Sequence, residues 1–352
     1  MTTICITKIS ETTHVMLELV YLSGCNILIL CVFVCYSLVH PLSPRGKLVH
    51  GGRDGLKATN QLIHQAIKHK PSCVLRDKLF RVALTDKNVH QLQQTALQYP
   101  DLCEWISPEK MKEITGTSSL GAVQLANGCK VLHVPSYLEG LWMECVERSE
   151  HTAQWSVERA VDEPDFDWRE RLQDFDTVIL AAGAGLFQTS VLNQKNFPVD
   201  LIRGQSIEMV VPDDYFLDEA LLCGKYISPL LESNRLLIGA THEYRPEPLS
   251  ERDVVNDLRA RSYELAPNLW DRGTVDKITT GYRVQSRRGT FGRLPIVGRL
   301  SEIHSDAWIF TGLSSRGLLY HGLYGDILTD AILGECNDTL WNEYNLDWWR
   351  QH

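Results

Sequence analysis

Two side chains in the C-terminal half, Arg283 and Tyr226, could together bind a carboxylate. A guanidinium can hold both oxygens of a carboxylate through two parallel hydrogen bonds, and a phenol can donate a third. Alone, each residue would more often be a surface or structural residue. We therefore predict a binding site for an acidic substrate only if the fold brings the two together.

A second candidate feature is the turn GLSSRG at 312 to 317, which lies between an apolar run and a helical pattern. Gly312 and Gly317 would let the backbone approach a ligand, and the free N–H groups of a helix start favour negative charge. The alternative is an ordinary core helix after a tight turn. The GLSSRG motif also resembles the nucleophile elbow of serine hydrolases, with His321 nearby. That motif needs glycine two residues after Ser314, where Arg316 stands.

The stretch FDTVILAAGAGLF, residues 175 to 187, is apolar until it reaches Gly183 and Gly185. Such a run is typical of a parallel strand that is buried on both faces. GAGLFQ imitates a dinucleotide fingerprint, but Gln188 stands where the third glycine is needed for helix packing. An ordinary corner between a strand and a turn is the favoured interpretation.

The composition limits the classes of partner. The 352 residues could form one large domain or two interleaved ones, and their formal net charge is −9. This charge suits neither a nucleic acid nor an anionic membrane surface, except at a local patch. Such a patch could admit an anionic tail, even an RNA phosphate, although a small amine or amino acid is favoured. Its arginines are Arg283, Arg287, Arg288, Arg293 and Arg299.

The ten cysteines include no C-x-x-C pair and no Cys/His pairing at zinc-finger spacing. We therefore predict no metal site, and mostly buried, reduced thiols. This usage indicates an intracellular compartment, either the cytoplasm or an organelle.

Other elements must position these residues. Helical periodicity predicts helices at 53–69, on both sides of Pro100, near 254–266 and after Gly317. Strands are expected at 226–230 and 235–240, and a hairpin should turn at Asn127–Gly128. The charged stretch 158–176 should be a solvated loop. The last helix should bury a stripe formed by Leu318, Leu319, Leu323, Ile327 and Ala331.

The apolar run from Leu19 to Val39 contains no charged residue and is about long enough to cross a bilayer. Arg45 and Lys47, just beyond it, would place the rest of the chain in the cytosol. A membrane anchor through 19–39 is therefore an alternative. Asn26, three cysteines inside the run and the lack of a cleavable signal-peptide layout weigh against it.

Taken together, five parts of the chain resemble the glycine oxidase and D-amino-acid oxidase (DAO) family of FAD-dependent oxidoreductases. They are HPLSPRGK (40–47), FDTVILAAGAG with IRGQ (175–185, 202–205), YISP with RLLIGAT (226–229, 235–241), GYR…GRLPIVG (281–298) and TGLSSRGLLYHGLYGDIL (311–328). HPLSPRGK and GLSSRGLLYH look closest to the oxidoreductase domain of bifunctional enzymes that modify the wobble uridine of bacterial tRNA. No methyltransferase half is present here.

The resemblance implies an α/β fold with a Rossmann-like FAD-binding domain and a second, α+β domain whose antiparallel sheet covers the substrate. The implied segments are 38–72, 128–203 and 281–341 for the first domain, and 73–127 and 204–280 for the second. In such enzymes a C–N bond of an amino acid or secondary amine gives a hydride to the flavin. The resulting imine then hydrolyses.

The resemblance also implies roles for residues. Arg283 and Tyr226 would hold the substrate carboxylate, the 40–47 loop would lie beside the flavin ring, and the turn at 312 would lie by its pyrimidine edge. The implied FAD-binding residues are His40, Ser43, Pro44, Arg45, Gly46, Ala182, Gly183, Gly312, Ser315, Arg316, Gly317 and Leu318.

One departure from the family pattern concerns the start of the chain. The family opens with a strand, G-x-G-x-x-G and a helix, whereas the only glycine before position 40 is Gly24. We therefore expect residues 1–37 to be an atypical apolar segment that is not native to a truncated FAD-binding domain. FAD should bind weakly, because its pyrophosphate loses an anion site. The alternatives are a non-catalytic remnant or a membrane-tethered isoform that cannot hold FAD.

Overall fold

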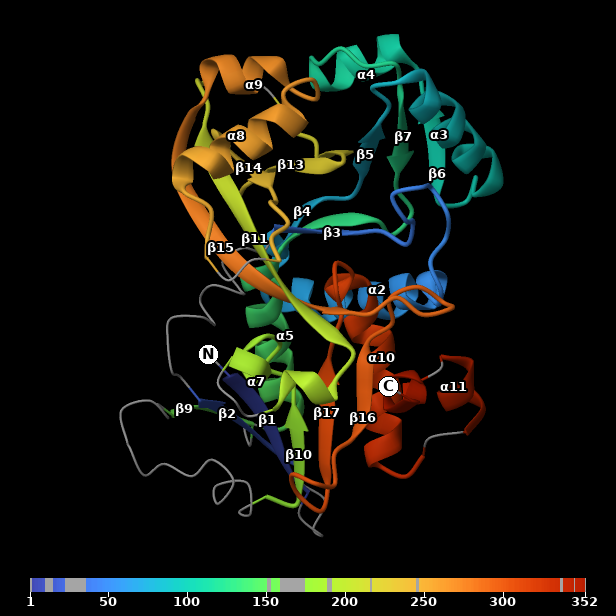
Figure 1. The fold of residues 1–352 in the computed structure, drawn as a ribbon, viewed down its shortest axis with the longest axis vertical. Coiled ribbons are helices and arrows are strands. Elements are labelled where there is room, and N and C mark those ends of the chain that lie inside the picture. The colour runs from blue at the N-terminus through green and yellow to red at the C-terminus, as the bar shows by residue number, and fades with distance from the viewer. Residues whose placement is uncertain are drawn as a thin grey trace.

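The computed structural model describes residues 2–9, 15–22, 36–150, 153–158, 175–188, 192–215, 217–244, 247–335, 338–344 and 346–351. Their strands form three sheets (Figure 1). The first sheet has six strands in the order β16 (Ile296–Arg299), β17 (Ala307–Thr311), β10 (Thr177–Leu180), β1 (Thr2–Ile9), β2 (Val15–Leu22) and β9 (Gln154–Glu158). A small sheet has the order β3 (Tyr36–Val39), β8 (Lys130–His133) and β4 (Val74–Arg76).

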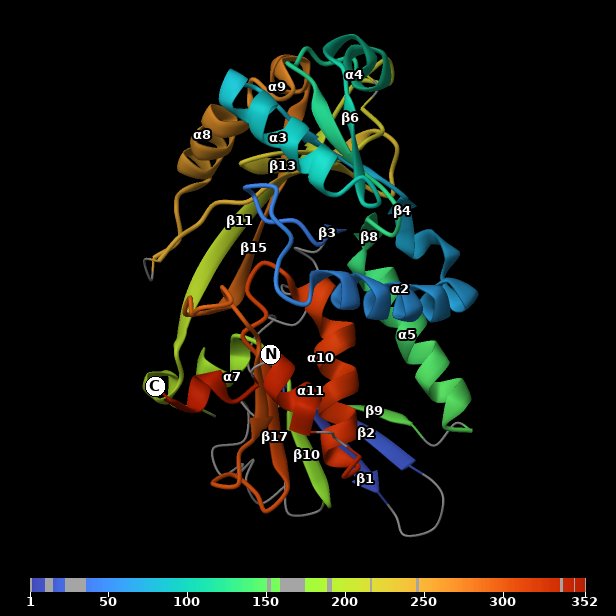
Figure 2. The same cartoon turned by 90° about the vertical axis from the view of Figure 1, so that its right-hand side faces the viewer.

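The six-stranded sheet is mixed. β10 runs parallel to β17, which confirms the parallel strand predicted from its apolar run, and β2 runs parallel to β9. β1 is antiparallel to both β10 and β2. Next to this sheet lie three helices, α2 (Gly52–His69), α5 (Val134–Arg148) and α10 (Gly317–Ile332), and they pack against one another (Figure 2).

The second large sheet has eight strands. Their order is β15 (Thr274–Ser286), β11 (Val199–Val210), β14 (Arg235–Gly239), β13 (Lys225–Pro229), β12 (Leu221–Cys223), β5 (Leu79–Val82), β7 (Ala122–Leu125) and β6 (Cys103–Ile106). It is antiparallel as expected, except that β12 and β5 pair in parallel. The long strands β11 and β15 extend from it toward the six-stranded sheet (Figure 1). The fold is therefore the predicted mixed α/β architecture.

One face of the eight-stranded sheet is covered by helices. Phe80, Ile207 and Ile238 point to this face, where they belong to an apolar core shared with α8 (Glu251–Ser262) and α9 (Pro267–Arg272). Because side chains alternate along a strand, the neighbours of these residues point to the opposite face. That inner face carries the polar residues of the candidate site.

The helix predictions at 53–69 and around Pro100 are confirmed by α2, α3 (Asp86–Gln98) and α4 (Pro108–Thr115). Ser107 caps α4 by accepting a hydrogen bond from the Lys110 amide at 3.3 Å. The predicted hairpin is wrong. Asn127 and Gly128 do form a turn with positive φ values, but β7 before it and β8 after it belong to different sheets. This turn carries the chain from one sheet to another. Which strands pair on either side of it is determined by tertiary contacts and not by the turn residues.

The first 37 residues are described only in part. β1 and β2 place two of their pieces in the six-stranded sheet, while residues 23–35, most of the suggested membrane span, lie outside the described residues. Within the described ranges, no helix has the length and apolar character needed to cross a membrane. Most of the predicted loop at 158–176 also lies outside them. The domain boundaries stay a prediction.

Five cysteines lie among the residues whose side chains are described, and all five are free thiols. Cys73, Cys103 and Cys129 are buried, whereas Cys145 is exposed and Cys223 is half-buried. Within this set, most of the thiols are buried, as expected.

The α2–α10 contact depends on a glycine. A Cβ on Gly55 would lie 2.6 Å from the Leu319 carbonyl oxygen, so Gly55→Ala should lower the free energy of unfolding by about 1–3 kcal/mol. A Cβ added to Gly325 in α10 would meet no other atom. Gly325→Ala should therefore raise the free energy of unfolding by about 0.4–1 kcal/mol. Urea denaturation of both variants checks the pair. Equal effects would contradict the close helix contact.

Candidate active site

Tyr226 lies on the inner face of the eight-stranded sheet. It is opposite Gly239 in the β13–β14 register, and a Cβ on Gly239 would lie 2.3 Å from the phenol oxygen. The phenol oxygen also lies 3.3 Å from Ser206 Oγ on β11. Only a residue without a side chain at 239 lets the phenol cross β14, so this glycine positions Tyr226.

Arg283 lies on the same face. Ser206 pairs with Thr279, and Ile202, four residues before Ser206, pairs with Arg283, four residues after Thr279. An even spacing along a strand keeps side chains on one face. A Cβ on Gly204 would lie 3.3 Å from Arg283 Nη2, so the guanidinium passes over that glycine.

The charge of Arg283 is not balanced by the described part of the chain. No carboxylate oxygen of the described residues lies within 4.0 Å of its guanidinium. Burial lowers the pKa of Arg283, and the phenols of Tyr226 and Tyr244 act in the opposite direction. The structure therefore brings the two predicted carboxylate-binding residues together and leaves the cation able to bind an acid.

The turn at 312 to 317 is joined to the strand of Arg283. The Ser314 amide donates to the Val284 carbonyl at 3.1 Å, and Leu313 forms a β-bridge with Gln285. α10 then begins at Gly317 without a side-chain cap, so its first N–H groups can bind an anion. The helix start and Arg283 thus lie at one junction between the two large sheets.

Gly312 and Gly183 place two turns at one sheet edge. They follow the parallel neighbours β17 and β10, and their φ values are 70° and 55°. Ligands of α/β sheets bind at the carboxyl ends of parallel strands. Gly183 has open space around its Cβ position, with Ala182 before it, but the following helix α7 (Gly185–Gln188) has only 4 residues. GAGLFQ is therefore a corner after a strand, as favoured from the sequence.

The alternative of a serine hydrolase has no support in the geometry. Ser314 Oγ lies 3.3 Å from Ser286 Oγ and donates to the Gly312 carbonyl. His321 Nε2 instead lies 2.7 Å from Tyr137 Oη, and its Nδ1 lies 3.1 Å from the Leu318 carbonyl. The histidine therefore anchors the first turn of α10 and activates no serine. The buried stripe of α10 contains Leu319 and Ile327 as predicted, together with Tyr320, Tyr324 and Leu328.

The half-buried His321 should make stability depend on pH. Burial lowers its pKa from 6.5 to about 4, so between these values the unfolded chain binds a proton that the folded one does not. Stability is then lost as the pH falls, by roughly 2 kcal/mol from pH 7 to pH 5. Denaturant titrations at both pH values measure this loss of stability. It should be smaller in His321→Gln. It should be unchanged in His90→Gln, which alters an exposed histidine of α3. Equal losses in all three proteins would contradict it.

The loop at 40 to 47 is only partly at the junction. Burial lowers the pKa of His40 to about 3, and the nearby charges of Arg81 and Arg316 add to this effect. The Ser43 carbonyl accepts a hydrogen bond from Arg81 Nη1 at 2.7 Å. Three further predicted cofactor residues of this loop point elsewhere: Pro44 and Arg45 are exposed, and Gly46 packs against Thr95 of α3. Their role stays a prediction.

Sequence reasoning missed three residues of this junction, Arg81, His242 and Tyr244. Arg81 is a lone cation in the apolar strand LFRV, and that break in the pattern was a usable signal. Tyr244 accepts a hydrogen bond from Gln285 at 3.3 Å, and its phenol lies 3.2 Å from His242 Nε2. These two come after β14, and the sequence carries no signal for them. The proposed arginine patch does not stay whole, because Arg299 forms an ion pair with Asp306.

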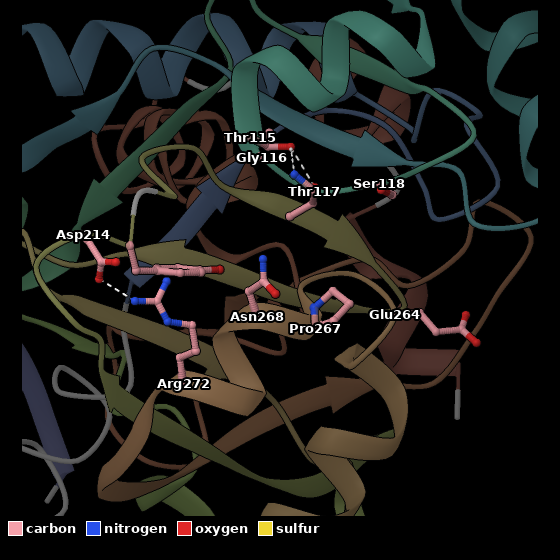
Figure 3. A pocket seen from close by; sticks show the side chains of 10 residues that line it. Thr115, Gly116, Thr117, Ser118, Asp214, Glu264, Pro267, Asn268 and Arg272 are labelled. Carbon is pink, nitrogen blue, oxygen red and sulfur yellow. Dashed lines mark hydrogen bonds and ion pairs between the residues drawn. The ribbon is translucent and has the colours of Figure 1, made fainter.

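Two groups of residues lie outside this junction. A cavity of about 370 Å³ is lined by Thr115, Tyr215 and Arg272 among others, and it contains none of the predicted site residues (Figure 3). His69 and Glu144 come together with Glu147 near the ends of α2 and α5. Hydrogen bonds from His69 and Arg148 lower the pKa of Glu144 to about 2, so this cluster is a network of ion pairs.

The residues at the junction fit the ring end of a flavin. The uncapped start of α10 and the Arg316 guanidinium can hold the electron-rich pyrimidine edge of the ring, and His40 Nδ1 is buried without a hydrogen-bond partner in the described chain. The chain before residue 40 has no G-x-G-x-x-G to hold the pyrophosphate of FAD. The fit of the described residues is therefore to the flavin ring.

Comparison with known proteins places this geometry in a family. The family model described as "FAD dependent oxidoreductase" (DAO) matches residues 38–331. The chain is 28% identical over 163 residues to glycine oxidase of Pseudomonas putida, covering 45% of this chain and 42% of that protein. It is 26% identical over 248 residues to the tRNA 5-methylaminomethyl-2-thiouridine biosynthesis bifunctional protein MnmC of Marinobacter nauticus, covering 60% and 38%. The matched regions thus span less than half of these curated relatives.

Solved structures share the fold. The iminodiacetate oxidase from Chelativorans sp. BNC1 has a TM-score of 0.69 at 16% identity, covering 93% of this chain and 91% of that one. The glycine oxidase from Geobacillus kaustophilus has a TM-score of 0.67 at 16% identity, covering 91% and 89%. Neither comparison singles out the tRNA enzyme over glycine oxidase as the nearer relative. Because the family model covers most of its length, this chain belongs to the DAO family of FAD-dependent oxidoreductases.

Proposed function

We propose that this protein oxidises a C–N bond of a small amino acid or secondary amine that carries a carboxylate. The observation that carries the proposal is Arg283, a partly buried cation without a carboxylate partner in the described chain, beside Tyr226 and the start of α10. A guanidinium in this position selects for an acid and fixes its orientation. The name of the Pseudomonas putida relative makes glycine a first candidate substrate.

In this proposal the chain binds and orients, and FAD, when bound, supplies the hydride acceptor. Arg283 and Tyr226 hold the carboxylate, so that the adjoining C–N bond has one fixed direction. Gly312, Ser315, Arg316, Gly317 and Leu318, together with His40, Ser43, Ala182 and Gly183, are proposed to face the flavin. The segments 38–72, 128–203 and 281–341 would form the cofactor domain, and 73–127 and 204–280 the substrate domain.

The test is anaerobic reduction. Protein with added excess FAD is mixed with glycine or N-methylglycine, and the visible flavin absorbance is followed. It should fall with both acids and remain with methylamine, which has the amine but lacks the carboxylate. If no carboxylated amine bleaches protein-bound flavin, the proposed oxidation is wrong.

A further inference from the structure

Three basic side chains from separate parts of the chain meet beside the candidate site. His40 follows β3, Arg81 lies on β5, and Arg316 stands just before α10. Burial lowers the pKa of both His40 and Arg81, and electrostatic repulsion lowers them further, from Arg81 and Arg316 in the first case and from Arg316 in the second. The three groups are therefore close enough to act on one another.

The described chain provides no acid for this cluster. No carboxylate oxygen of the described residues is within 4.0 Å of either guanidinium, in contrast to nearby Arg76, which forms an ion pair with Asp218. Arg81 Nε is buried and has no hydrogen-bond partner among the described groups, whereas Arg81 Nη1 donates to the Ser43 carbonyl at 2.7 Å. Buried donors without partners are costly, and a buried cation without an acid more so. A bound anion would satisfy Arg81.

Arg81 is placed to act on the substrate. It pairs with Leu222 in the β5–β12 register, and Leu222 pairs with Tyr226 in the β12–β13 register. Residues paired in this way share one face, so Arg81 and Tyr226 lie on the same inner face, with backbones about 10 Å apart at the usual strand spacing. Both side chains are long enough to contact one small ligand.

We propose that Arg81 binds a second acidic group of the substrate, beside His40 and Arg316, which face the flavin, so that the protein prefers amines with two carboxylates. Arg283 and Tyr226 hold the first carboxylate, so this inference rests on the proposed function. Arg81 comes from the same sheet as these two residues, which favours a substrate group over the cofactor as its ligand. It is thus a specificity-determining residue.

The experiment compares two acids that have no C–N bond and cannot be oxidised by this chemistry. Calorimetry measures the binding of glutarate, a diacid, and butyrate, a monoacid, to the protein with excess FAD. Glutarate should bind at least about tenfold more tightly, the value of one charge-assisted contact. Arg81→Met should remove this preference and leave butyrate binding unchanged. Arg76→Met, a change to an arginine that already has an acid partner, should alter neither affinity.

Three outcomes would overturn the inference. They are equal binding of the two acids by the wild-type protein, equal weakening of both acids in Arg81→Met, and a selective loss of flavin affinity in Arg81→Met. The last would assign Arg81 to the cofactor. Failure of the proposed function is seen separately, as the absence of flavin bleaching by any amine, because neither acid here requires turnover.

Discussion

Replacing Arg283 by leucine is expected to lower kcat/KM for a carboxylated amine by about 10²–10³-fold. Removing one partner of a desolvated, hydrogen-bonded charge pair costs about 2–5 kcal/mol, and each 1.36 kcal/mol is a factor of ten in rate. Arg283 meets this description because burial lowers its pKa and no carboxylate of the described chain offsets its charge. Steady-state oxidation in the presence of excess FAD measures the effect.

Arg235→Leu is the matched control for this change. Arg235 lies on β14 of the same sheet and already forms ion pairs with Glu208 and Asp276, so its loss should affect kcat/KM less than about threefold. Arg283→Lys keeps the charge and loses the two parallel hydrogen bonds. Its kcat/KM should therefore lie between those of Arg283→Leu and Arg235→Leu. Similar rates for Arg283→Leu and Arg235→Leu would exclude the carboxylate-binding role.

The affinity for FAD is expected to exceed that for FMN by less than about tenfold. A glycine turn with its helix start contributes a few kcal/mol toward the pyrophosphate, and 1.4 kcal/mol is already tenfold in affinity. The chain has no G-x-G-x-x-G before residue 40, and the helix after β10 is only 4 residues long. Among the described residues, we therefore expect no group that strongly favours the dinucleotide over its flavin half.

Quenching of flavin fluorescence on titration with protein measures both dissociation constants. The protein should also lose most of its flavin during gel filtration. A preparation that retains stoichiometric FAD, or one that prefers FAD over FMN by a thousandfold, would show that another part of the chain holds the pyrophosphate.

Local patterns in the sequence were enough to predict most helices and several strands. The spacing of Leu56, Ile63 and Ala66 predicted α2, and these residues are buried in the structure. The apolar run before Gly183 predicted a parallel strand, since such a strand must be covered on both faces. The partner of each strand could not be predicted in this way. The turn at Asn127 and Gly128 has local geometry suited to a hairpin, yet β8 gains its partners from β3 and β4.

The candidate site, like the fold, could be predicted from the sequence only in part. Arg283 and Tyr226 were singled out by chemistry, and their pairing followed from the family resemblance, not from spacing. Their approach depends on the register of four strands and on Gly239, which no local pattern encodes. Arg81 breaks the apolar pattern of its strand, but it was missed because a single arginine in a strand is usually a surface residue.

The start of α10 and Arg283 are expected to face one ligand site. A crystal structure of the protein soaked with millimolar flavin and N-methylglycine tests it most directly. The flavin ring should lie against Gly317 and Leu318, with the carboxylate on the Arg283 guanidinium. Flavin density in another place, such as the cavity beside Arg272, would contradict the account.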